Sequence, residues 1–306
     1  MTPPELATVL RLLPAPVIET TQFGGGGRPR GIRYGATEAV LRWNDFSRSR
    51  AFGFSDDEAI ASIHWLHTLL EDIATTGFVA PRPVHDLDGR SVAIVDRGIW
   101  ELLSRVPGRP MSWSDDDMLA AGSLLARFHE VSVRLPARPQ RPGAQPFVVC
   151  EPAHPKAQAV RVAFEREMTA LAPAHGVPGV IHGDATQSNV IVGRDGCFYL
   201  VDFALAYEEH LYADIGSALW RNGRSSADAV TYDPKRAARF VRGYHLVRSL
   251  APEAASAIVT FMKGRGLQLQ HRLELRTGRD DTVIQRLMAI DAEGARITDA
   301  IEAALS

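Results

Sequence analysis

The organisation of this chain is decided by two neighbouring stretches, His182-Gly183-Asp184-Ala185-Thr186-Gln187-Ser188-Asn189-Val190-Ile191-Val192 and Phe198-Tyr199-Leu200-Val201-Asp202-Phe203. The Asp195-Gly196 pair between them is typical of a hairpin turn, so the two apolar runs are predicted to form antiparallel strands. Asn189 precedes the first strand and Asp202 follows the second. Because an antiparallel hairpin brings these positions to the same end, the sequence predicts an amide and a carboxylate side by side.

The residue types in this hairpin indicate a chemistry. An amide oxygen and a carboxylate are hard ligands that suit Mg²⁺ when it also binds phosphate oxygens. Asp184, five residues before Asn189, is placed to accept a proton from an incoming hydroxyl. Taken singly, each residue could belong to an ordinary polar hairpin. With 10 His, 25 Gly and 3 Asn in the chain, however, the pattern His-Gly-Asp-x4-Asn arises by chance on the order of once per thousand chains or less. We therefore interpret the combination as functional.

Composition sets the broad class of the protein. The chain has 306 residues, 45% of them hydrophobic and 23% charged, with two cysteines and a formal net charge of −2. These values are typical of a globular protein in a reducing compartment and exclude a disulfide framework. They also argue against a nucleic-acid partner. No apolar run is long enough to span a membrane and no signal peptide is recognised, so we expect a cytoplasmic protein without a membrane partner. The oligomeric state is left open.

The chain divides into two predicted parts. Residues 1–106 alternate strand-like runs with Gly-rich turns around one long helix, whereas residues 107–306 are mostly helical. Pro107-Gly108-Arg109-Pro110 is the candidate hinge. The predicted class is therefore α+β, with a small β-rich lobe and a larger helical lobe. Such a layout is typical of proteins that hold a ligand in the cleft between two lobes.

Three motifs carry a resemblance to a known family. The segment His182-Gly183-Asp184 through Asn189, Val201-Asp202-Phe203 and the later Asp214-Ile215-Gly216 resemble the aminoglycoside phosphotransferase and choline kinase family. The resemblance covers most of the chain. It implies the two-lobed protein-kinase-like fold, with residues 1–106 as a nucleotide-binding N-lobe and residues 107–306 as a catalytic and acceptor-binding C-lobe. It also implies ATP or GTP as phosphate donor, with Mg²⁺.

The resemblance assigns roles residue by residue. Asp184 is expected to be the catalytic base, and Asn189 and Asp202 the magnesium ligands. Asp214 is expected to brace the catalytic loop through backbone hydrogen bonds. His182 is expected to pack that loop rather than to carry protons.

The nucleotide side departs from the family pattern. The strand lysine that holds the nucleotide phosphates in this family is replaced here by Arg42, and the first 155 residues contain no lysine at all. Arginine keeps the charge and binds phosphate bidentately, but its geometry differs. Glu58 either orients Arg42 or only completes the capping box that begins at Ser55, and the sequence leaves both open.

Two further nucleotide contacts are expected. The run Gly24-Gly25-Gly26-Gly27 joins two strands, where bare backbone either approaches phosphates or forms a flexible hairpin tip. The adenine base is expected to meet backbone around Leu102 and Leu103.

The acceptor is expected to be a small hydroxylated molecule. Only eleven residues separate Asp202 from Asp214, too few for a peptide-docking segment. The acceptor site is expected to use aromatic, polar, acidic and basic residues from the later part of the chain: Tyr207, Glu208, Glu209, Trp220, Arg221, Gln268, His271 and Arg272. Acidic residues would suit an aminoglycoside or amino alcohol, and basic ones a carboxylate-bearing acceptor.

Three alternatives for the function stay open. Gly243 to Arg248 and Gly77 to Pro83 resemble the homoserine kinase branch, although that branch usually has alanine where this chain has Gly183. Antibiotic modification suits the arginine-rich, lysine-poor composition. A nucleotide-binding pseudokinase is the third alternative, because Arg42 replaces the lysine.

Overall fold

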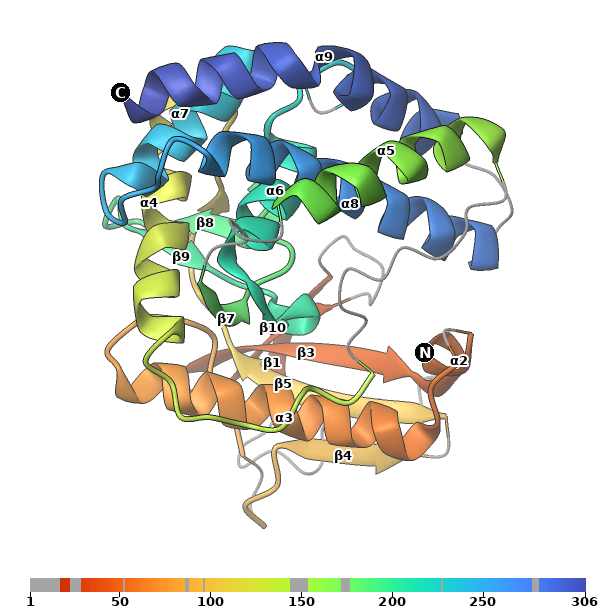
Figure 1. Cartoon of the computed structure of the whole chain (residues 1–306). Coiled ribbons are helices and arrows are strands. Elements are labelled where there is room, and N and C mark those ends of the chain that lie inside the picture. Colours follow the sequence, from red (N-terminus) through yellow and green to blue (C-terminus); the bar gives the residue numbers. More distant parts are fainter. Residues whose placement is uncertain are drawn as a thin grey trace. The chain divides into compact units, whose positions relative to one another are not determined.

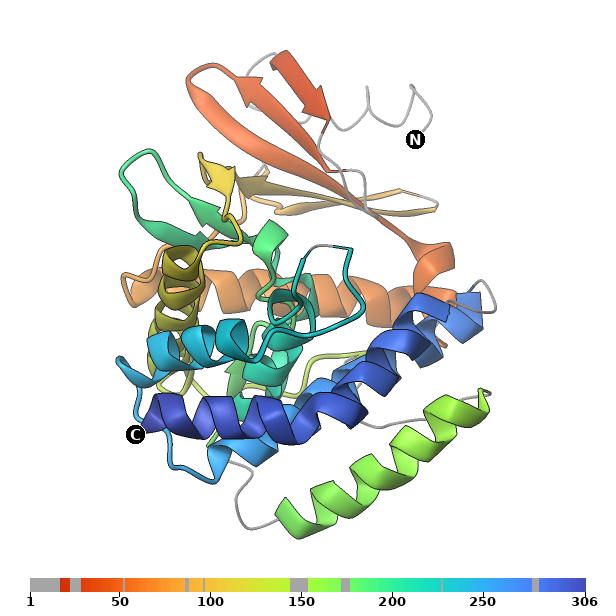
Figure 2. The same ribbon diagram turned by 90° about the horizontal axis from the view of Figure 1, so that it is seen from above.

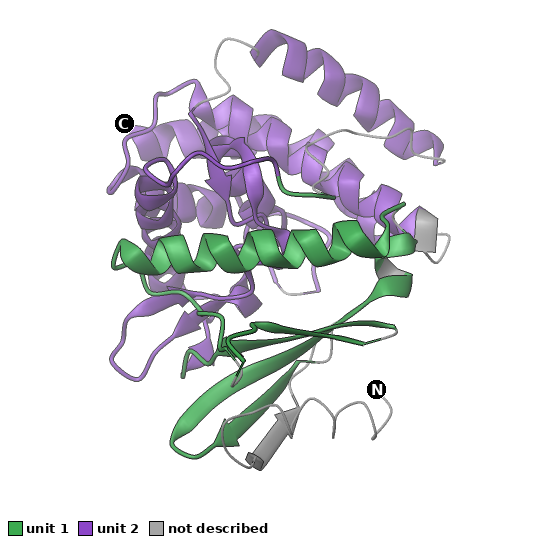
Figure 3. Ribbon diagram, turned by 90° about the horizontal axis from the view of Figure 1, so that it is seen from below, with its two compact units in different colours: residues 1–107, 141–143 green, residues 108–140, 144–306 purple. Residues whose placement is uncertain are grey.

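The computed structural model describes residues 17–22, 29–51, 53–85, 88–95, 97–143, 154–171, 177–226, 228–276 and 281–306. The chain forms two compact units (Figure 3). Unit 1 comprises Met1–Pro107 together with Arg141–Gly143, and unit 2 comprises Gly108–Gln140 and Ala144–Ser306.

Unit 1 is built around an antiparallel sheet of five strands in the order β1-β2-β3-β5-β4 (Figure 1). Its elements are β1 (Val17–Gln22), β2 (Arg30–Tyr34), β3 (Thr37–Asp45), α2 (Phe46–Arg50), α3 (Asp56–Thr75), β4 (Val92–Val95) and β5 (Gly98–Ser104). Strand β5 pairs with β3 on one side and β4 on the other, and six of its seven residues are buried. Strand β5 is therefore part of the core of the unit.

Helix α3 begins where the sequence predicts. The Ser55 hydroxyl accepts a hydrogen bond from the Glu58 amide, and the Glu58 carboxylate accepts one from the Ser55 amide, which completes a capping box. Apolar residues at helical spacing then bury one face, including Ile63, Leu66 and Leu70. This packing fixes the long helix within unit 1.

Unit 2 is mostly helical and also contains several short strands (Figure 2). Its helices are α4 (Asp115–Ser132), α5 (Pro155–Leu171), α6 (Leu211–Asn222), α7 (Pro234–His245), α8 (Ala254–Arg276) and α9 (Asp281–Leu305). Its strands are β6 (Arg109–Pro110), β7 (Pro178–Ile181), β8 (Val190–Val192), β9 (Phe198–Leu200) and β10 (Tyr207–His210), with 3-10 turns η2 (Gln187–Asn189) and η3 (Phe203–Leu205). Helix α6 packs against α4, α7, α8 and β7, so it lies at the centre of the unit.

The α+β class predicted from the sequence is confirmed. The two apolar runs form the predicted antiparallel hairpin of β8 and β9, and the chain from residue 107 onward is mostly helical, as predicted. The sequence did not predict β10, which pairs antiparallel with β7 from Tyr207↔Ile181 to His210↔Pro178. In the part of the chain that the structure describes, no helix combines the length and apolarity needed to cross a membrane.

Candidate active site

The β8–β9 hairpin brings the ends of the two strands together. Val190 pairs with Leu200 and Val192 with Phe198. The Val201 amide donates a hydrogen bond of 2.9 Å to the Asn189 carbonyl, which extends the pairing one step beyond β8. Asn189 and Asp202 therefore lie at the same end of the hairpin, and Asp202 directly follows the residue that is bonded to Asn189.

Asp184 is tied to Asn189. The Asn189 amide nitrogen Nδ2 donates to the Asp184 carbonyl at 2.9 Å and to the Asp184 carboxylate Oδ2 at 2.9 Å. The Asp184 side chain nevertheless keeps 28% of its surface exposed, so a molecule from solution can reach the carboxylate. These two hydrogen bonds fix the orientation of the candidate base, and the Asn189 amide oxygen Oδ1 accepts a hydrogen bond of 3.4 Å from the Ser188 hydroxyl.

Asp202 has an unusual backbone conformation. With φ 59° and ψ 66°, it is the only non-glycine residue with positive φ among the described residues. Aspartate tolerates this left-handed region better than most residues, but strain of this kind concentrates at functional sites. Its Oδ1 accepts a hydrogen bond of 3.4 Å from the Ala204 amide, and the side chain is exposed.

The donor set at the end of the hairpin fits a magnesium ion. The Asn189 amide oxygen and the Asp202 carboxylate are both hard oxygen donors, and Mg²⁺ is commonly held by one or two protein groups together with substrate phosphates and water. Among the described residues, no three His, Cys, Asp or Glu side chains cluster as an all-protein metal cage would require. These two residues could therefore hold the metal only with phosphate or water completing its shell.

The loop before Asn189 is anchored by a buried aspartate. The Asp214 carboxylate accepts hydrogen bonds from the His182 amide at 2.6 Å and the Gly183 amide at 2.8 Å. On the same oxygen as His182, the His129 Nε2 atom lies 3.0 Å away, and His129 Nδ1 lies 2.8 Å from the Tyr244 hydroxyl. The predicted bracing role of Asp214 is confirmed, and α4 and α7 extend the network.

Burial determines the charge states in this network. Burial lowers the pKa of His129, so the ring is neutral, donates from Nε2 to Asp214 and accepts from Tyr244 at Nδ1. Burial raises the pKa of Asp214, but the hydrogen bonds that Asp214 accepts from the His129 ring and from the His182 backbone outweigh it, so the net shift is downward. Asp214 therefore stays ionised as a buried acceptor of backbone hydrogen bonds.

His182 has a structural role in the loop. Its Nδ1 accepts a hydrogen bond of 3.2 Å from the Asp184 amide, so Nε2 carries the proton and donates to the Val201 carbonyl at 3.0 Å. The ring is fully buried and lies 4.5 Å from the ring of Phe203. The two ring nitrogens thus connect the loop that carries Asp184 to the end of strand β9.

A second anchor of the loop was missed at the level of sequence. Asn222, at the end of α6, donates to the Ala185 carbonyl at 2.9 Å and accepts from the Gln187 amide at 2.9 Å. The Gln187 side chain donates to the Met111 carbonyl at 2.9 Å. A single asparagine at a helix end gives no pattern in the sequence, although its complete burial is unusual for its type.

In unit 1, Arg42 binds Glu101. Its Nε donates to Glu101 Oε1 at 2.6 Å, and Asn44 Nδ2 donates to the same oxygen at 2.6 Å. The other oxygen, Oε2, lies 2.9 Å from His67 Nε2, and His67 Nδ1 lies 2.7 Å from the Ser91 hydroxyl. Burial would raise the pKa of Glu101, but Arg42 and His67 together lower it to about 2.

The structure resolves the two alternatives for Glu58. Its carboxylate accepts from the Ser55 amide and hydroxyl, as in a capping box, and the carboxylate that orients Arg42 is Glu101 on the neighbouring strand. The assignment of Glu58 as the partner of Arg42 is therefore corrected. Strand pairing decides the matter, because the β3–β5 register places Arg42 opposite Glu101.

The other nucleotide contacts have different outcomes. Gly24-Gly25-Gly26-Gly27 lie outside the described residues, so their contact with phosphates stays a prediction. The Leu102 carbonyl accepts from the Val84 amide at 2.8 Å, and Leu103 pairs with Val40 in the sheet. This backbone is thus already hydrogen-bonded within unit 1 in this structure.

Arg141 is a second cation near Glu101 that the sequence gave no reason to single out. It belongs to the segment Arg141–Gly143 of unit 1, its Nε donates to the Ser62 hydroxyl at 2.8 Å, and its guanidinium lies over the Trp65 ring. Burial and the charge of Arg42 both lower the pKa of Arg141, whereas Glu101 raises it, and the net result is a pKa of about 10.

Residues expected at the acceptor site fall into two groups. Trp220 is 2% exposed and packs in the core against Tyr232, so it is not available to an acceptor. Gln268 is also buried, at 7% exposed, and the remaining six are distributed over β10, the end of α6 and one half of α8. Arg265, also on α8, was missed: its Nη2 lies 3.5 Å from Asp184 Oδ1.

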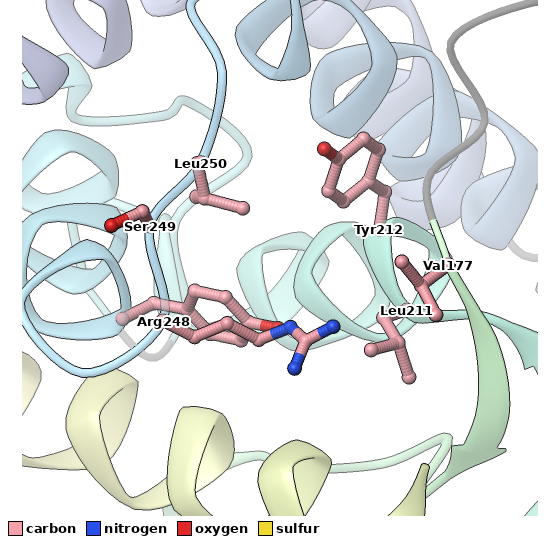
Figure 4. A pocket seen from close by; sticks show the side chains of 7 residues that line it. Val177, Leu211, Tyr212, Arg248, Ser249 and Leu250 are labelled. Atoms are coloured by element: carbon pink, nitrogen blue, oxygen red, sulfur yellow. The ribbon is translucent and has the colours of Figure 1, made fainter.

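One small pocket in unit 2 lies away from these residues (Figure 4). It is lined by Val177, Leu211, Tyr212, Tyr244, Arg248, Ser249 and Leu250, and the Arg248 side chain extends from one wall toward Leu211. Its volume of about 70 Å³ holds a few water molecules at most. It is therefore too small for a nucleotide.

The fold and the loop geometry define a protein with the protein-kinase-like fold. The chain belongs to the phosphotransferase enzyme family, whose family model matches residues 21–255. A homoserine kinase from Methylobacillus glycogenes is 28% identical over 213 residues, which make up 65% of this chain and 64% of that protein. The chain thus spans slightly less than two thirds of the length of that relative.

Two solved structures share the fold at low identity. A microcompartment-associated aminopropanol kinase has a TM-score of 0.71 at 16% identity, covering 99% of this chain and 98% of that one. The amicoumacin kinase hAmiN in complex with AMP-PNP, Ca²⁺ and Ami has a TM-score of 0.68 at 17% identity, covering 99% and 94%.

Proposed function

We propose that this protein is an ATP-dependent O-phosphotransferase that transfers the γ-phosphate to a hydroxyl of a small molecule. The observation that carries the proposal is the catalytic loop: Asp184 is oriented by Asn189, partly exposed, and held on the same hairpin end as Asp202. Family membership supports the reaction class, and a relative bound to AMP-PNP supports a nucleotide donor. GTP is the alternative donor.

In this mechanism Asp184 acts on the acceptor. Its carboxylate accepts the proton of the acceptor hydroxyl as that oxygen bonds to the γ-phosphorus, and the bond from phosphorus to the bridging oxygen of ADP breaks. Asn189 and Asp202 would hold the magnesium ion, which neutralises charge on the phosphate oxygens when bound. Arg42, oriented by Glu101, would bind phosphate through its guanidinium group. Residues 1–106 would bind nucleotide and residues 107–306 the acceptor.

The acceptor class is narrower than any hydroxylated molecule. The relatives named above are, by their names, a homoserine kinase, an aminopropanol kinase and an amicoumacin kinase. Homoserine and aminopropanol are small molecules that carry both a hydroxyl and a nitrogen. We propose an acceptor within this range.

The test compares Asp184→Asn with Asp195→Asn. Asp195 lies at the turn of the same hairpin and bonds Tyr199, so its substitution is a matched control outside the proposed chemistry. Asp184→Asn should lose about 10²–10⁴-fold in turnover while nucleotide binding persists, because only the base is removed. The measurement is magnesium-dependent ADP release across a panel of hydroxylated metabolites and antibiotics.

The opposite outcome would favour a pseudokinase. If the wild-type protein binds nucleotide but no acceptor raises ADP release above the Asp184→Asn background, the protein is a binding module. Arg42 in place of lysine is the observation that keeps this alternative open. Undiminished turnover in Asp184→Asn would show that the base is another residue.

A further inference from the structure

Arg265 is brought to the catalytic loop by the packing of α8 on α6. Gly266, its neighbour, lies against the Trp220 ring, and a Cβ atom there would overlap with that ring. Helix α6 carries Asp214 and Asn222, which hold the catalytic loop. The close approach of α8 to α6 therefore places Arg265 beside Asp184.

The contacts of Arg265 are long for a buried cation. The residue is 7% exposed, its Nη2 lies 3.5 Å from Asp184 Oδ1, and its Nη1 donates to Gln268 at 3.4 Å. Charge-assisted hydrogen bonds of arginine are usually about 2.7–2.9 Å. A guanidinium has five donors, so these two contacts leave most of its hydrogen-bonding capacity for another group.

Lys263, a buried cation on the same helix, is paired more closely with carboxylates than Arg265 is. It is 6% exposed and contacts two carboxylates, Glu167 at 2.6 Å and Asp291 at 3.2 Å. Among the described residues, Asp184 is the one carboxylate within ion-pair distance of Arg265. Buried charges are normally paired closely, so the longer contacts of Arg265 allow its guanidinium group to bind a further anionic group.

The surroundings of Arg265 contain further donors and one opposing charge. Arg272 lies seven residues later on the same face of α8. Burial raises the pKa of the Tyr207 phenol and Glu209 raises it further, whereas Arg265 and Arg272 lower it. Both guanidinium groups and the Glu209 carboxylate are therefore close enough to the half-buried Tyr207 side chain to act on it electrostatically.

We infer that Arg265 binds a carboxylate of the acceptor, so that the preferred substrates are hydroxy acids or hydroxy amino acids. Asp184 Oδ2 contacts Asn189 and Oδ1 lies near Arg265. An acceptor whose hydroxyl is at Asp184 can therefore reach the guanidinium with a carboxylate only a few bonds away from that hydroxyl. Arginine and carboxylate match bidentately. This inference rests on the proposed function and narrows its acceptor to one chemical class.

The test uses acceptor pairs that differ only in the carboxylate. L-Homoserine is compared with 3-aminopropan-1-ol, L-threonine with 1-aminopropan-2-ol, and L-serine with ethanolamine, each with ATP and Mg²⁺. The wild-type enzyme should prefer at least one acid over its partner by about 100-fold in kcat/KM, as loss of hydrogen bonds to a charged group predicts.

Variants then locate the preference. Arg265→Gln should lose about 100-fold in kcat/KM for the acid, mainly through KM, and change the amino alcohol little. Arg265→Lys should recover part of the loss, because it keeps the charge without the fork of donors. Arg194→Gln, an exposed arginine at the hairpin turn, is the matched control and should resemble the wild type.

Each result decides between the claims. Equal use of acids and amino alcohols overturns the carboxylate inference and leaves the proposed function intact. An equal loss on both classes in Arg265→Gln means that the arginine acts through Asp184 or on the transferred phosphoryl group rather than on a carboxylate of the acceptor, which also overturns the inference. If nucleotide binds but no acid is phosphorylated, the inference is wrong. If nucleotide binding is absent as well, the proposed function itself falls.

Discussion

Glu101 is buried in unit 1 between Arg42 and His67, and its acidity follows from these neighbours. Burial alone disfavours the charged carboxylate, yet the guanidinium and the imidazole lower its pKa from the ordinary value of 4.5 to about 2. Asn44 donates to the same oxygen as Arg42, so the ionised form accepts three side-chain contacts in total. At the residue scale, this carboxylate is what orients the candidate phosphate-binding arginine.

The depressed pKa of Glu101 predicts a pH dependence of folding. The unfolded chain protonates this group near pH 4.5 and the folded chain near pH 2, so the stabilisation is complete above 4.5 and is lost as the pH falls through about 2. The full effect is at most roughly 3 kcal/mol. The free energy of unfolding of Glu101→Gln, measured by urea denaturation from pH 7 to pH 2, should fall below that of the wild type at pH 7.

The difference between the two proteins is the informative quantity, since other carboxylates titrate in the same range. It should shrink between pH 4.5 and 2 and vanish at the acid end. A difference that stays constant over this range would mean that Glu101 acts through packing rather than through its charge.

Single residues of the candidate site were predictable only where their partners are close in sequence. Asp184, Asn189 and Asp202 share one loop and hairpin, so spacing alone brings them together. Glu101 is 59 residues from Arg42, and Arg265 reaches Asp184 from a distant helix. Such contacts depend on strand register and helix packing, which no local pattern encodes. Glu58 was considered for Arg42 because a helix carboxylate is expected there, but its capping partner is three residues away.

At the scale of elements, the catalytic loop is held in a tight turn at Gly183. This residue has φ 75°, and a Cβ atom would overlap with the Leu205 carbonyl, which belongs to η3 after the hairpin. The Gly183 amide also donates to Asp214. The loop thus requires glycine for both its conformation and its close approach to η3.

Gly183→Ala should therefore impair the loop more than an ordinary glycine substitution. We expect a loss of stability of at least about 2 kcal/mol, from the left-handed conformation together with the overlap, and a lower kcat with nucleotide binding retained. The matched control is Gly196→Ala, which has φ 76° and nothing within 4 Å of the added carbon. It should show only the conformational cost, about 1–2 kcal/mol. Equal losses in both variants, measured by thermal denaturation, would contradict the role of the Leu205 contact.

Elements with strong local signals were predicted from the sequence, and short ones were not. The capping box of α3 and the apolar spacing along α9 each specify a helix without help from distant residues. Strand β10 has only four residues, Tyr-Glu-Glu-His, with no alternation of apolar residues. It is a strand because β7 lies beside it, so its formation is a tertiary effect.

At the scale of the whole molecule, ligand binding should be visible as stability. A ligand that binds only the folded chain raises the free energy of unfolding by about 2.7 kcal/mol at one hundred times its dissociation constant. If Asn189 and Asp202 hold magnesium together with the nucleotide phosphates, ATP with Mg²⁺ should stabilise the protein more than ATP alone. We expect a rise in the melting temperature of about 5 °C with both ligands present.

Removal of the metal also tests the assignment of Asn189 and Asp202 as magnesium ligands. Excess EDTA should reduce the shift to that of ATP alone, and Asp202→Asn should do so even with Mg²⁺ present. Asparagine tolerates the left-handed backbone that residue 202 adopts, so this variant removes the charge while keeping the conformation. Its melting temperature without ligand should therefore stay close to that of the wild type. A full magnesium-dependent shift in Asp202→Asn would mean that the metal is held by other groups, and the hairpin end would then lose its proposed place in nucleotide binding.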